Sequence, residues 1–341
     1  MTTRASAPGK LFLLGEYAVL EGAPALLTAV DRRVQVTVNH SADDLWHLRM
    51  LGLESDAGEP GALTLHADGT LPNTLSASTR ASLSVFDAVR STLARELRGS
   101  ASDRPLEILI DSTDFQQDGH KLGLGSSAAV ATALTAALAI HAGHEPDNNE
   151  LFTLAMDAHT TAQGGTGSGG DVATSVHGGQ LVYVKGEPPL SVTLPTDLGG
   201  FAVQTGTGSA TVDLVARVRD YAQSDPSSYA EDMGKLVHLA RQVEAALTDA
   251  NSFLALADDY FVALQTLDAH AKAGIVTAQH LTMREQAFRS GGVFKSSGAG
   301  GGDLGLVFSR MSSLRELEES FRSALPIPLS VNTAGWRREA A

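Results

Sequence analysis

The chain has 341 residues, of which 43% are hydrophobic and 19% are charged, and its formal net charge at pH 7 is −14. This length suffices for two domains of ordinary size, and the composition is that of a globular chain rather than a disordered one. The negative charge opposes non-specific binding to nucleic acid or anionic lipid. The sequence contains no cysteine, which excludes disulfides, thiolate zinc sites and cysteine nucleophiles.

Hydrophobic runs in the sequence are short. None reaches the roughly 18 residues that a membrane-spanning helix needs, and the apolar run Leu11–Leu14 near the N-terminus is too short for a signal-peptide core. We therefore expect a cytoplasmic protein with a small-molecule substrate and no nucleic-acid or membrane partner. It is expected to be a monomer or a homodimer.

The first part of the chain predicts alternating strands and helices. Short apolar runs followed by period-two alternation predict strands over 10–14 and 33–38. Apolar residues spaced three and four apart predict an amphipathic helix over 73–97. A strand is predicted over 106–110, and an alanine-rich run bounded by serine and glycine predicts a buried helix over 126–141.

The second part of the chain predicts a mixture in which strands enclose helices. The remaining elements are a helix over 150–163, a strand over 180–185, and strands over 201–205 and 304–308 that bracket a helical region over 213–289. The proline-rich stretch 187–195 is a plausible link between domains. We therefore predict an α+β protein with an N-terminal domain over 1–195 and a C-terminal domain over 196–341.

Three glycine-rich segments stand out, and the first, Lys121–Ala129, precedes the alanine-rich helix. Glycines let backbone N–H groups approach a ligand, and a helix start adds partial positive charge, so this loop is suited to phosphate. The hydroxyls of Ser126 and Ser127 could cap the helix or coordinate a magnesium ion held by phosphates. The sequence alone leaves both roles open.

The second segment, Gln163–Ala173, leads to Asp171, which taken alone is a general base, a magnesium ligand or a helix cap. The third, Phe294–Gly305, combines glycines with a lysine and serines in the manner of an anion nest. Both contain G-x-G-x-x-G, but neither follows a strand and opens a helix with an acidic residue about twenty positions on, so dinucleotide binding is a weak interpretation. A Walker A sequence is absent.

Three stretches, in this order and at this spacing, resemble the three motifs of the GHMP kinases. They are Ala7–Val19, Gly123–Ala129 and Lys295–Gly302. The resemblance implies a two-domain GHMP kinase fold, in which the first domain is like domain 2 of ribosomal protein S5 and the second is ferredoxin-like. It also implies an ATP-dependent small-molecule kinase that uses Mg²⁺.

Within this superfamily, Ala158–Ala173 resembles the Ala-His-x-x-x-Gln-Gly-x-x-Gly-Ser-Gly-x-Asp-Val-Ala pattern of phosphomevalonate kinases. Mevalonate kinases tend to carry Pro-Ser-Gly before this aspartate and a magnesium-binding glutamate eleven residues ahead of it, where this chain has Thr160. The resemblance implies phosphorylation of (R)-5-phosphomevalonate to 5-diphosphomevalonate in the mevalonate pathway of isoprenoid biosynthesis.

Two other functions stay open. One is a mevalonate kinase, or another GHMP kinase that acts on an alcohol. The other is an inactive nucleotide-binding regulator, against which the presence of Lys10, Ser127 and Asp171 argues.

The resemblance also assigns roles to single residues. Lys10 is expected near the transferred phosphoryl group with Asp171, which either removes a proton or only orients Lys10 and the metal. The nucleotide is expected on Lys121, Gly123, Leu124, Gly125, Ser126 and Ser127, with Ser127 as the metal ligand. The acceptor substrate is expected on Ser168, Gly169, Ser209, Thr211, Lys295, Ser296, Ser297, Gly298, Ala299 and Gly300.

One further stretch and three single residues carry expectations about their roles. The stretch Gln204–Val212 resembles the family's substrate-side loop, whose hydroxyls and following helix start suit a carboxylate or phosphate. Arg217 and Arg219 are candidate cations, although arginine on a helix surface is more often solvated. For His159 we predict a packing or hydrogen-bonding role and not a catalytic one.

Overall fold

The computed structural model describes residues 1–52, 63–97, 104–117, 120–165, 167–206, 211–324, 326–329 and 333–340. By contacts the chain forms two compact units. Unit 1 comprises residues 1–10, 29–178 and 332–341, and unit 2 comprises residues 11–28 and 179–331. The strands β1 (Thr3–Leu14) and β2 (Ala25–His40) therefore contribute residues to both units. A division of the chain at one point, between 195 and 196, stays a prediction.

The sheet of unit 1 has the strand order β14-β1-β2-β5-β3-β4. Its further strands are β3 (Trp46–Leu51), β4 (Leu63–Leu65), β5 (Leu106–Asp111) and β14 (Arg337–Glu339). Strand β2 runs antiparallel to β5, whereas β3 runs parallel to β5. Val34, Val36 and Val38 are all buried, as the period-two pattern requires of one strand face. The predicted strands over 10–14, 33–38 and 106–110 are confirmed.

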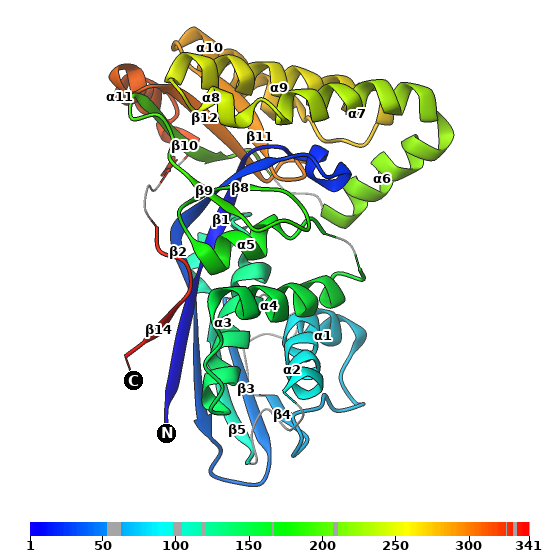
Figure 1. Cartoon of the computed structure of the whole chain (residues 1–341), viewed down its shortest axis with the longest axis vertical. Helices are drawn as coiled ribbons and strands as arrows, with labels where there is room; N and C mark the ends of the chain where they lie inside the picture. Colours follow the sequence, from blue (N-terminus) through cyan, green and yellow to red (C-terminus); the bar gives the residue numbers. More distant parts are fainter. Residues whose placement is uncertain are drawn as a thin grey trace. The chain divides into compact units, whose positions relative to one another are not determined.

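Five helices pack over one face of this sheet (Figure 1). They are α1 (Ala77–Ser82), α2 (Ser84–Glu96), α3 (Ser126–His141), α4 (Asn148–Ala162) and α5 (Gly170–His177). Helix α3 is buried on every side after its first turn, because its alanines let neighbours approach closely. The helix predicted over 126–141 is confirmed at both ends, and the one predicted over 73–97 is divided at Leu83 into α1 and α2.

Unit 2 has a four-stranded antiparallel sheet in the order β11-β12-β10-β13. Its strands are β10 (Leu198–Gln204), β11 (Val293–Ser297), β12 (Leu304–Arg310) and β13 (Ile327–Pro328). Its helices are α6 (Thr211–Ser224), α7 (Pro226–Ala240), α8 (Val243–Ala246), α9 (Ala250–Ala271), α10 (Ala278–Arg289) and α11 (Leu314–Ser320). The predicted helical region and the two strands that bracket it are confirmed.

Two short strands complete unit 2. Strand β8 (Gln180–Tyr183) pairs with residues 25–28 of β2 and with β9 (Leu190–Val192). A hairpin of β6 (Gln116–Gln117) and β7 (His120–Lys121) belongs to unit 1.

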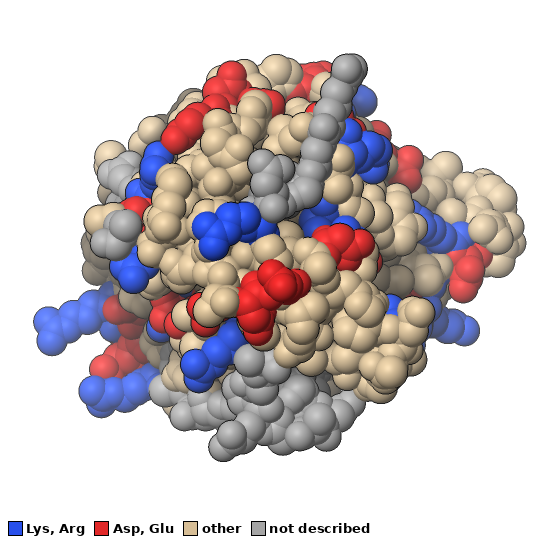
Figure 2. All heavy atoms as spheres, turned by 90° about the horizontal axis from the view of Figure 1, so that it is seen from below, with Lys and Arg blue, Asp and Glu red and all other residues tan. Residues whose placement is uncertain are grey.

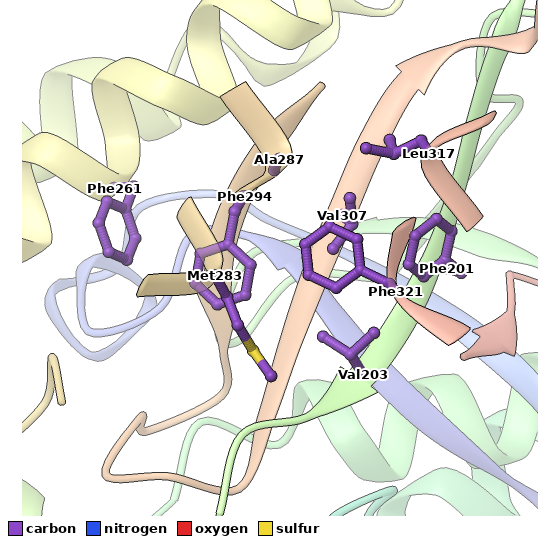
Figure 3. Close-up of a cluster of buried hydrophobic side chains, with 9 residues drawn as sticks. All are labelled: Phe201, Val203, Phe261, Met283, Ala287, Phe294, Val307, Leu317 and Phe321. Carbon is purple, nitrogen blue, oxygen red and sulfur yellow. The ribbon is translucent and has the colours of Figure 1, made fainter. Parts of the chain in front are cut away.

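An aromatic core fixes the strands of unit 2 against α9, α10 and α11 (Figure 3). It consists of Phe201, Val203, Phe261, Met283, Ala287, Phe294, Val307, Leu317 and Phe321. The rings of Phe261 and Phe294 meet edge to face with their centroids 5.8 Å apart, an arrangement that aromatic pairs prefer. Strand β11, which carries Phe294, is thereby anchored along its length.

The surface carries charges of both signs. On the face drawn in Figure 2, blue Lys and Arg side chains are interspersed with red Asp and Glu, and the described residues form no continuous basic patch there. Within the described part of the chain, no helix is long and apolar enough to cross a membrane.

Candidate active site

The loop before α3 is held against β1 by its backbone. The N–H of Lys10 donates to the carbonyl of Leu124 at 2.8 Å, and the N–H of Leu122 donates to the carbonyl of Phe115 at 2.9 Å. Gly123 and Gly125 have φ of 67° and 77°, which glycine adopts without the strain that a side chain would bring. The predicted phosphate loop is therefore an ordered turn joined to the strand that carries Lys10.

The start of α3 has no side-chain cap. Gly125 occupies the N-cap position, so the hydroxyls of Ser126 and Ser127 do not cap this helix, and the capping alternative for them is wrong. Both serines are half-buried. The first N–H groups of a helix lack partners within the helix, so an uncapped start is suited to an anionic ligand.

The side chain of Lys10 passes across this helix start. A methyl group built at Gly125 would lie 2.8 Å from Cε and 3.0 Å from Cγ of Lys10. A lysine ammonium and a helix N-terminus thus lie side by side in unit 1, and both favour negative charge. Any residue larger than glycine at position 125 would displace Lys10.

A buried histidine links three helices of unit 1. His159 on α4 is 3% exposed, and its Nε2 lies 3.1 Å from Ser127 Oγ and 3.2 Å from Gln163 Nε2. The same nitrogen is 3.9 Å from Asp171 Oδ2. The predicted hydrogen-bonding role of His159 is confirmed. The spacing of His159 and Gln163 places both on one face of α4, which is the signal that sequence reasoning could have used.

Asp171 lies in the first turn of α5. Gly169, with φ of 88°, is the N-cap residue, so Asp171 is not the cap, and its Oδ1 accepts a hydrogen bond from the N–H of Val172 at 3.0 Å. One turn later, the hydroxyl of Ser175 donates to the carbonyl of Pro8 at 2.8 Å. The helix that carries Asp171 is thus hydrogen-bonded to β1 two residues before Lys10.

Oxygen atoms of Ser127 and Asp171 both lie around His159 Nε2, and hydroxyl and carboxylate oxygens are hard donors of the kind Mg²⁺ prefers. The described residues contain no group of three or more His, Asp or Glu that could hold a metal by themselves. That fits an ion with few protein ligands, held mainly by substrate phosphates and water. The residues present are therefore compatible with Mg²⁺.

The third glycine-rich segment begins inside strand β11 and not in a loop. Lys295 and Ser296 are fully buried and Ser297 is 6% exposed. The ammonium of Lys295 lies 2.5 Å from Glu16 Oε1, so it is engaged in a buried ion pair. This corrects the sequence interpretation, which put Lys295, Ser296 and Ser297 in an anion-binding loop, because a buried and paired ammonium is not accessible to a phosphate.

Burial also affects the ionisation of this pair. It raises the pKa of Glu16, which Lys295 opposes, and it lowers the pKa of Lys295, which Glu16 opposes. The hydroxyl of Tyr260 donates to the backbone carbonyl of Glu16 at 2.9 Å, and the hydroxyl of Ser297 donates to the carbonyl of Phe12 at 3.0 Å. The residues around Glu16 and Lys295 form a buried polar support in unit 2.

The turn that follows, 298–302, is the part of the third segment with room for a ligand. Its glycines at 298, 300, 301 and 302 all have positive φ, and nothing lies within 4 Å of a methyl group built at Gly298. Tyr17 donates from its hydroxyl to the carbonyl of Ala299 at 2.7 Å. The predicted residues Gly298, Ala299 and Gly300 are thus in an ordered turn.

The other predicted residues are scattered. Lys121 is exposed on β7, and Thr211 is exposed at the start of α6. Ser168 Oγ accepts the N–H of Gly170 at 3.3 Å. Ser209 lies outside the described residues.

The candidate arginines also separate. Arg217 and Arg219 are both exposed, and Arg217 also donates to the carbonyl of Ala273 at 2.8 Å. Arg217 is therefore tied to the backbone after α9.

The chain belongs to the GHMP kinases. The model of the GHMP kinases N terminal domain matches residues 84–179. The chain is 31% identical to the phosphomevalonate kinase of Streptomyces sp. (strain CL190), over 95% of this chain and 96% of that protein. It is also 31% identical to the mevalonate kinase of Pyrococcus abyssi, over 87% of this chain and 86% of that protein.

A solved structure gives the same result for the fold. The phosphomevalonate kinase of Streptococcus pneumoniae, in complex with phosphomevalonate and AMPPNP, matches with a TM-score of 0.72 at 22% identity. The match covers 98% of this chain and 99% of that one. The predicted GHMP kinase fold is confirmed.

Proposed function

We propose that this GHMP kinase transfers the γ-phosphoryl group of ATP to (R)-5-phosphomevalonate and forms 5-diphosphomevalonate and ADP. The observation that carries the choice of acceptor is the similarity to the Streptomyces phosphomevalonate kinase over almost the whole of both chains. The AMPPNP in the Streptococcus complex supports ATP as donor. The bond from the γ-phosphorus to its bridging oxygen breaks, and a bond to an oxygen of the acceptor phosphate forms.

The proposed nucleotide site is the start of α3. Phosphoryl transfer is accelerated mainly by positioning the reactants and by neutralising charge on the phosphates. The turn 123–125 and the uncapped N–H groups of α3 supply fixed dipoles, and Lys10 supplies a charge beside them. Ser127 would ligate a Mg²⁺ ion, which when bound would neutralise charge on the ATP phosphates.

The role of Asp171 follows from the acceptor. A phosphomonoester has a second pKa of about 6, so it is mostly doubly ionised at pH 7 and needs no base to attack phosphorus. Asp171 then orients Lys10 and the metal, and His159 holds Ser127 beside it. An alcohol acceptor would instead need its proton removed, and Asp171 would be the base.

For the acceptor we propose Thr211 and the turn 298–300 of unit 2 as contacts. We propose that Lys295, Ser296 and Ser297 support that turn from beneath, since their side chains are buried. An acidic protein that binds a phosphorylated acceptor needs such local donors of backbone N–H groups.

Parallel measurement of ATP consumption with phosphomevalonate, mevalonate, galactose and homoserine tests the proposal. We expect turnover with phosphomevalonate that exceeds turnover with the other three by at least about 100-fold, because a site built to bind a phosphate group rejects an analogue that lacks it. Turnover with mevalonate alone would overturn the choice of acceptor and leave the kinase assignment standing. The similarity to the Pyrococcus mevalonate kinase makes this the second candidate.

A further inference from the structure

The connection between α9 and α10, residues 272–277, is tightly fixed within unit 2. The carboxylate of Asp268, in the last turn of α9, accepts hydrogen bonds from the backbone N–H groups of the chain just after the helix. The donors are Gly274, Ile275 and Val276, at 2.7, 2.9 and 2.9 Å. Bonds to an ionised acceptor are stronger than neutral ones, so these three contacts specify the conformation of the connection.

This connection in turn supports the glycine turn 298–302. The N–H of Gly301 donates to the carbonyl of Ile275 at 2.9 Å. A methyl group built at Gly300 would lie only 2.4 Å from that same carbonyl oxygen, so the two backbones touch. The turn assigned to the acceptor therefore rests on the backbone of Ile275.

The first turn of α10 also holds Thr205, the residue that follows β10, through His280. This side chain is fully buried in the first turn of α10, beside Phe294 of the aromatic core, with ring centroids 5.9 Å apart. Its Nδ1 accepts the N–H of Thr277 at 3.2 Å, and its Nε2 lies 2.9 Å from Thr205 Oγ1. A backbone N–H can only donate, so the ring proton is on Nε2 and His280 donates to Thr205.

His280 keeps this neutral form at the pH of an assay. Burial lowers its pKa to about 4, with Lys295 acting in the same direction and Asp268 and the Ile275 carbonyl opposing. The N–H of Thr205 donates to the carbonyl of Asp303 at 3.1 Å, so Thr205 is held through its side chain by α10 and through its backbone by the end of the glycine turn.

We propose that His280 is a positioning residue for an anionic acceptor substrate, because it fixes Thr205, whose backbone N–H is bonded to Asp303 at the end of the glycine turn. The inference rests on the function proposed above, which assigns the turn 298–300 to the acceptor. His280 does not touch the substrate. It acts through Thr205, while the connection 272–277 holds the same turn through the carbonyl of Ile275.

Two substitutions of His280 separate its two hydrogen bonds. His280→Asn can still accept the N–H of Thr277 with its amide oxygen, but it is too short to reach Thr205. His280→Gln extends an amide N–H towards Thr205. We expect His280→Asn to raise the KM for phosphomevalonate on the order of tenfold, as loss of one buried hydrogen bond predicts, with the KM for ATP unchanged. His280→Gln should stay within about threefold of wild type.

Substitutions at the other end of the bond provide the matched test. Thr205→Val removes the hydroxyl at nearly constant shape and should raise the KM for phosphomevalonate as His280→Asn does, whereas Thr205→Ser should not. The double variant His280→Asn/Thr205→Val should be no worse than either single variant, because both remove the same contact. Additive losses, or equal rises in the KM values for acceptor and ATP, would overturn the proposal.

The wild-type enzyme separates failure of this inference from failure of the proposed function. If wild type phosphorylates mevalonate and not phosphomevalonate, the acceptor is wrong, and the same variants tested with mevalonate decide the role of His280. If wild type phosphorylates none of the acceptors, the function is wrong and the inference that rests on it falls too. Circular dichroism of each variant checks that it folds, and the shape-conserving Thr205→Val decides the question if His280→Asn does not.

Discussion

The turn before α3 in unit 1 and the turn after β11 in unit 2 are both built on glycines with positive φ, and each follows a lysine. In unit 1 the lysine, Lys121, is exposed, and the serines after the turn are half-buried at an uncapped helix start. In unit 2 the lysine, Lys295, is buried in an ion pair beneath the turn. Similar chain segments thus form an accessible loop in one unit and a turn above a buried ion pair in the other.

The contrast teaches that the element before the turn decides the role of the polar residues. A two-residue strand at the surface leaves Lys121 in water. A five-residue strand in the aromatic core takes Lys295 inside, where an ammonium is stable only with a partner. We therefore expect substitutions in the accessible segment to alter ligand binding, and substitutions in the buried segment to lower the free energy of unfolding.

The largest expected effect is a difference in the free energy of unfolding between variants that lack one or the other lysine. Lys295→Met leaves Glu16 buried without its partner and should lower the free energy of unfolding by about 3–5 kcal/mol. Lys121→Met, at an exposed site, should change it by less than about 0.5 kcal/mol. Urea denaturation followed by circular dichroism measures both. The double variant Glu16→Gln/Lys295→Met should recover most of the loss, and equal destabilisation by the two lysine variants would refute the contrast.

The second largest expected effect is a loss of activity on substitution of Asp171, with stability unchanged. Asp171→Asn removes the charge that we propose to orient Lys10 and the metal, and we expect kcat to fall by about 10²–10³-fold, as for loss of one preorganised electrostatic contact. Its thermal unfolding midpoint should stay within about 2 °C of wild type, because Asp171 is 22% exposed and is not a helix cap. An Asp171→Asn variant with the turnover of wild type would show that Asp171 has no part in the reaction.

A pair of glycines at the two ends of α3 gives the third test. Gly125 and Gly143 have φ of 77° and 82°, so alanine at either should cost about 1–2 kcal/mol of stability. Only at Gly125 does the added methyl meet Lys10, whereas nothing lies within 4 Å at Gly143. Gly125→Ala should therefore also lower kcat/KM by about 10–100-fold. Equal activity of the two variants would show that Lys10 is not held by the turn.

The smallest expected effect is a dependence of stability on pH that arises from the buried His280 in unit 2. The pKa of His280 is about 4 in the folded protein against 6.5 for an unperturbed histidine, so between these values the unfolded chain binds more protons. Stability should fall as the pH is lowered from 6.5 towards 4, by up to about 1 kcal/mol per pH unit. His280→Asn should flatten this slope, and the exposed His238→Asn should not. Urea midpoints measured across this range decide the matter.

Most of the fold could be predicted because its elements carry local signals. The alternation over 33–38 and the alanine run over 126–141 follow from side-chain periodicity, and the structure has both where the sequence places them. Strand β11 was missed because glycines and serines in a row indicate a turn, whereas Phe294 and its aromatic partners decide the strand through contacts with residues distant in sequence.

The candidate site divides in the same way. The glycines of the first loop and Asp171 could be found from sequence, since their conformation and charge are properties of single residues. Glu16 could not, because its role depends on Lys295, which lies far along the chain. Nor could the bond between His280 and Thr205 be anticipated, since it joins α10 to the residue after β10, which only the tertiary structure brings together.

The alanine-rich interior of α3 limits how the enzyme can change. Helix α3 is enclosed on all sides after its first turn, so any side chain larger than alanine there would shift the whole helix, and with it the turn 123–125. For directed evolution, α3 is therefore the place to leave unchanged.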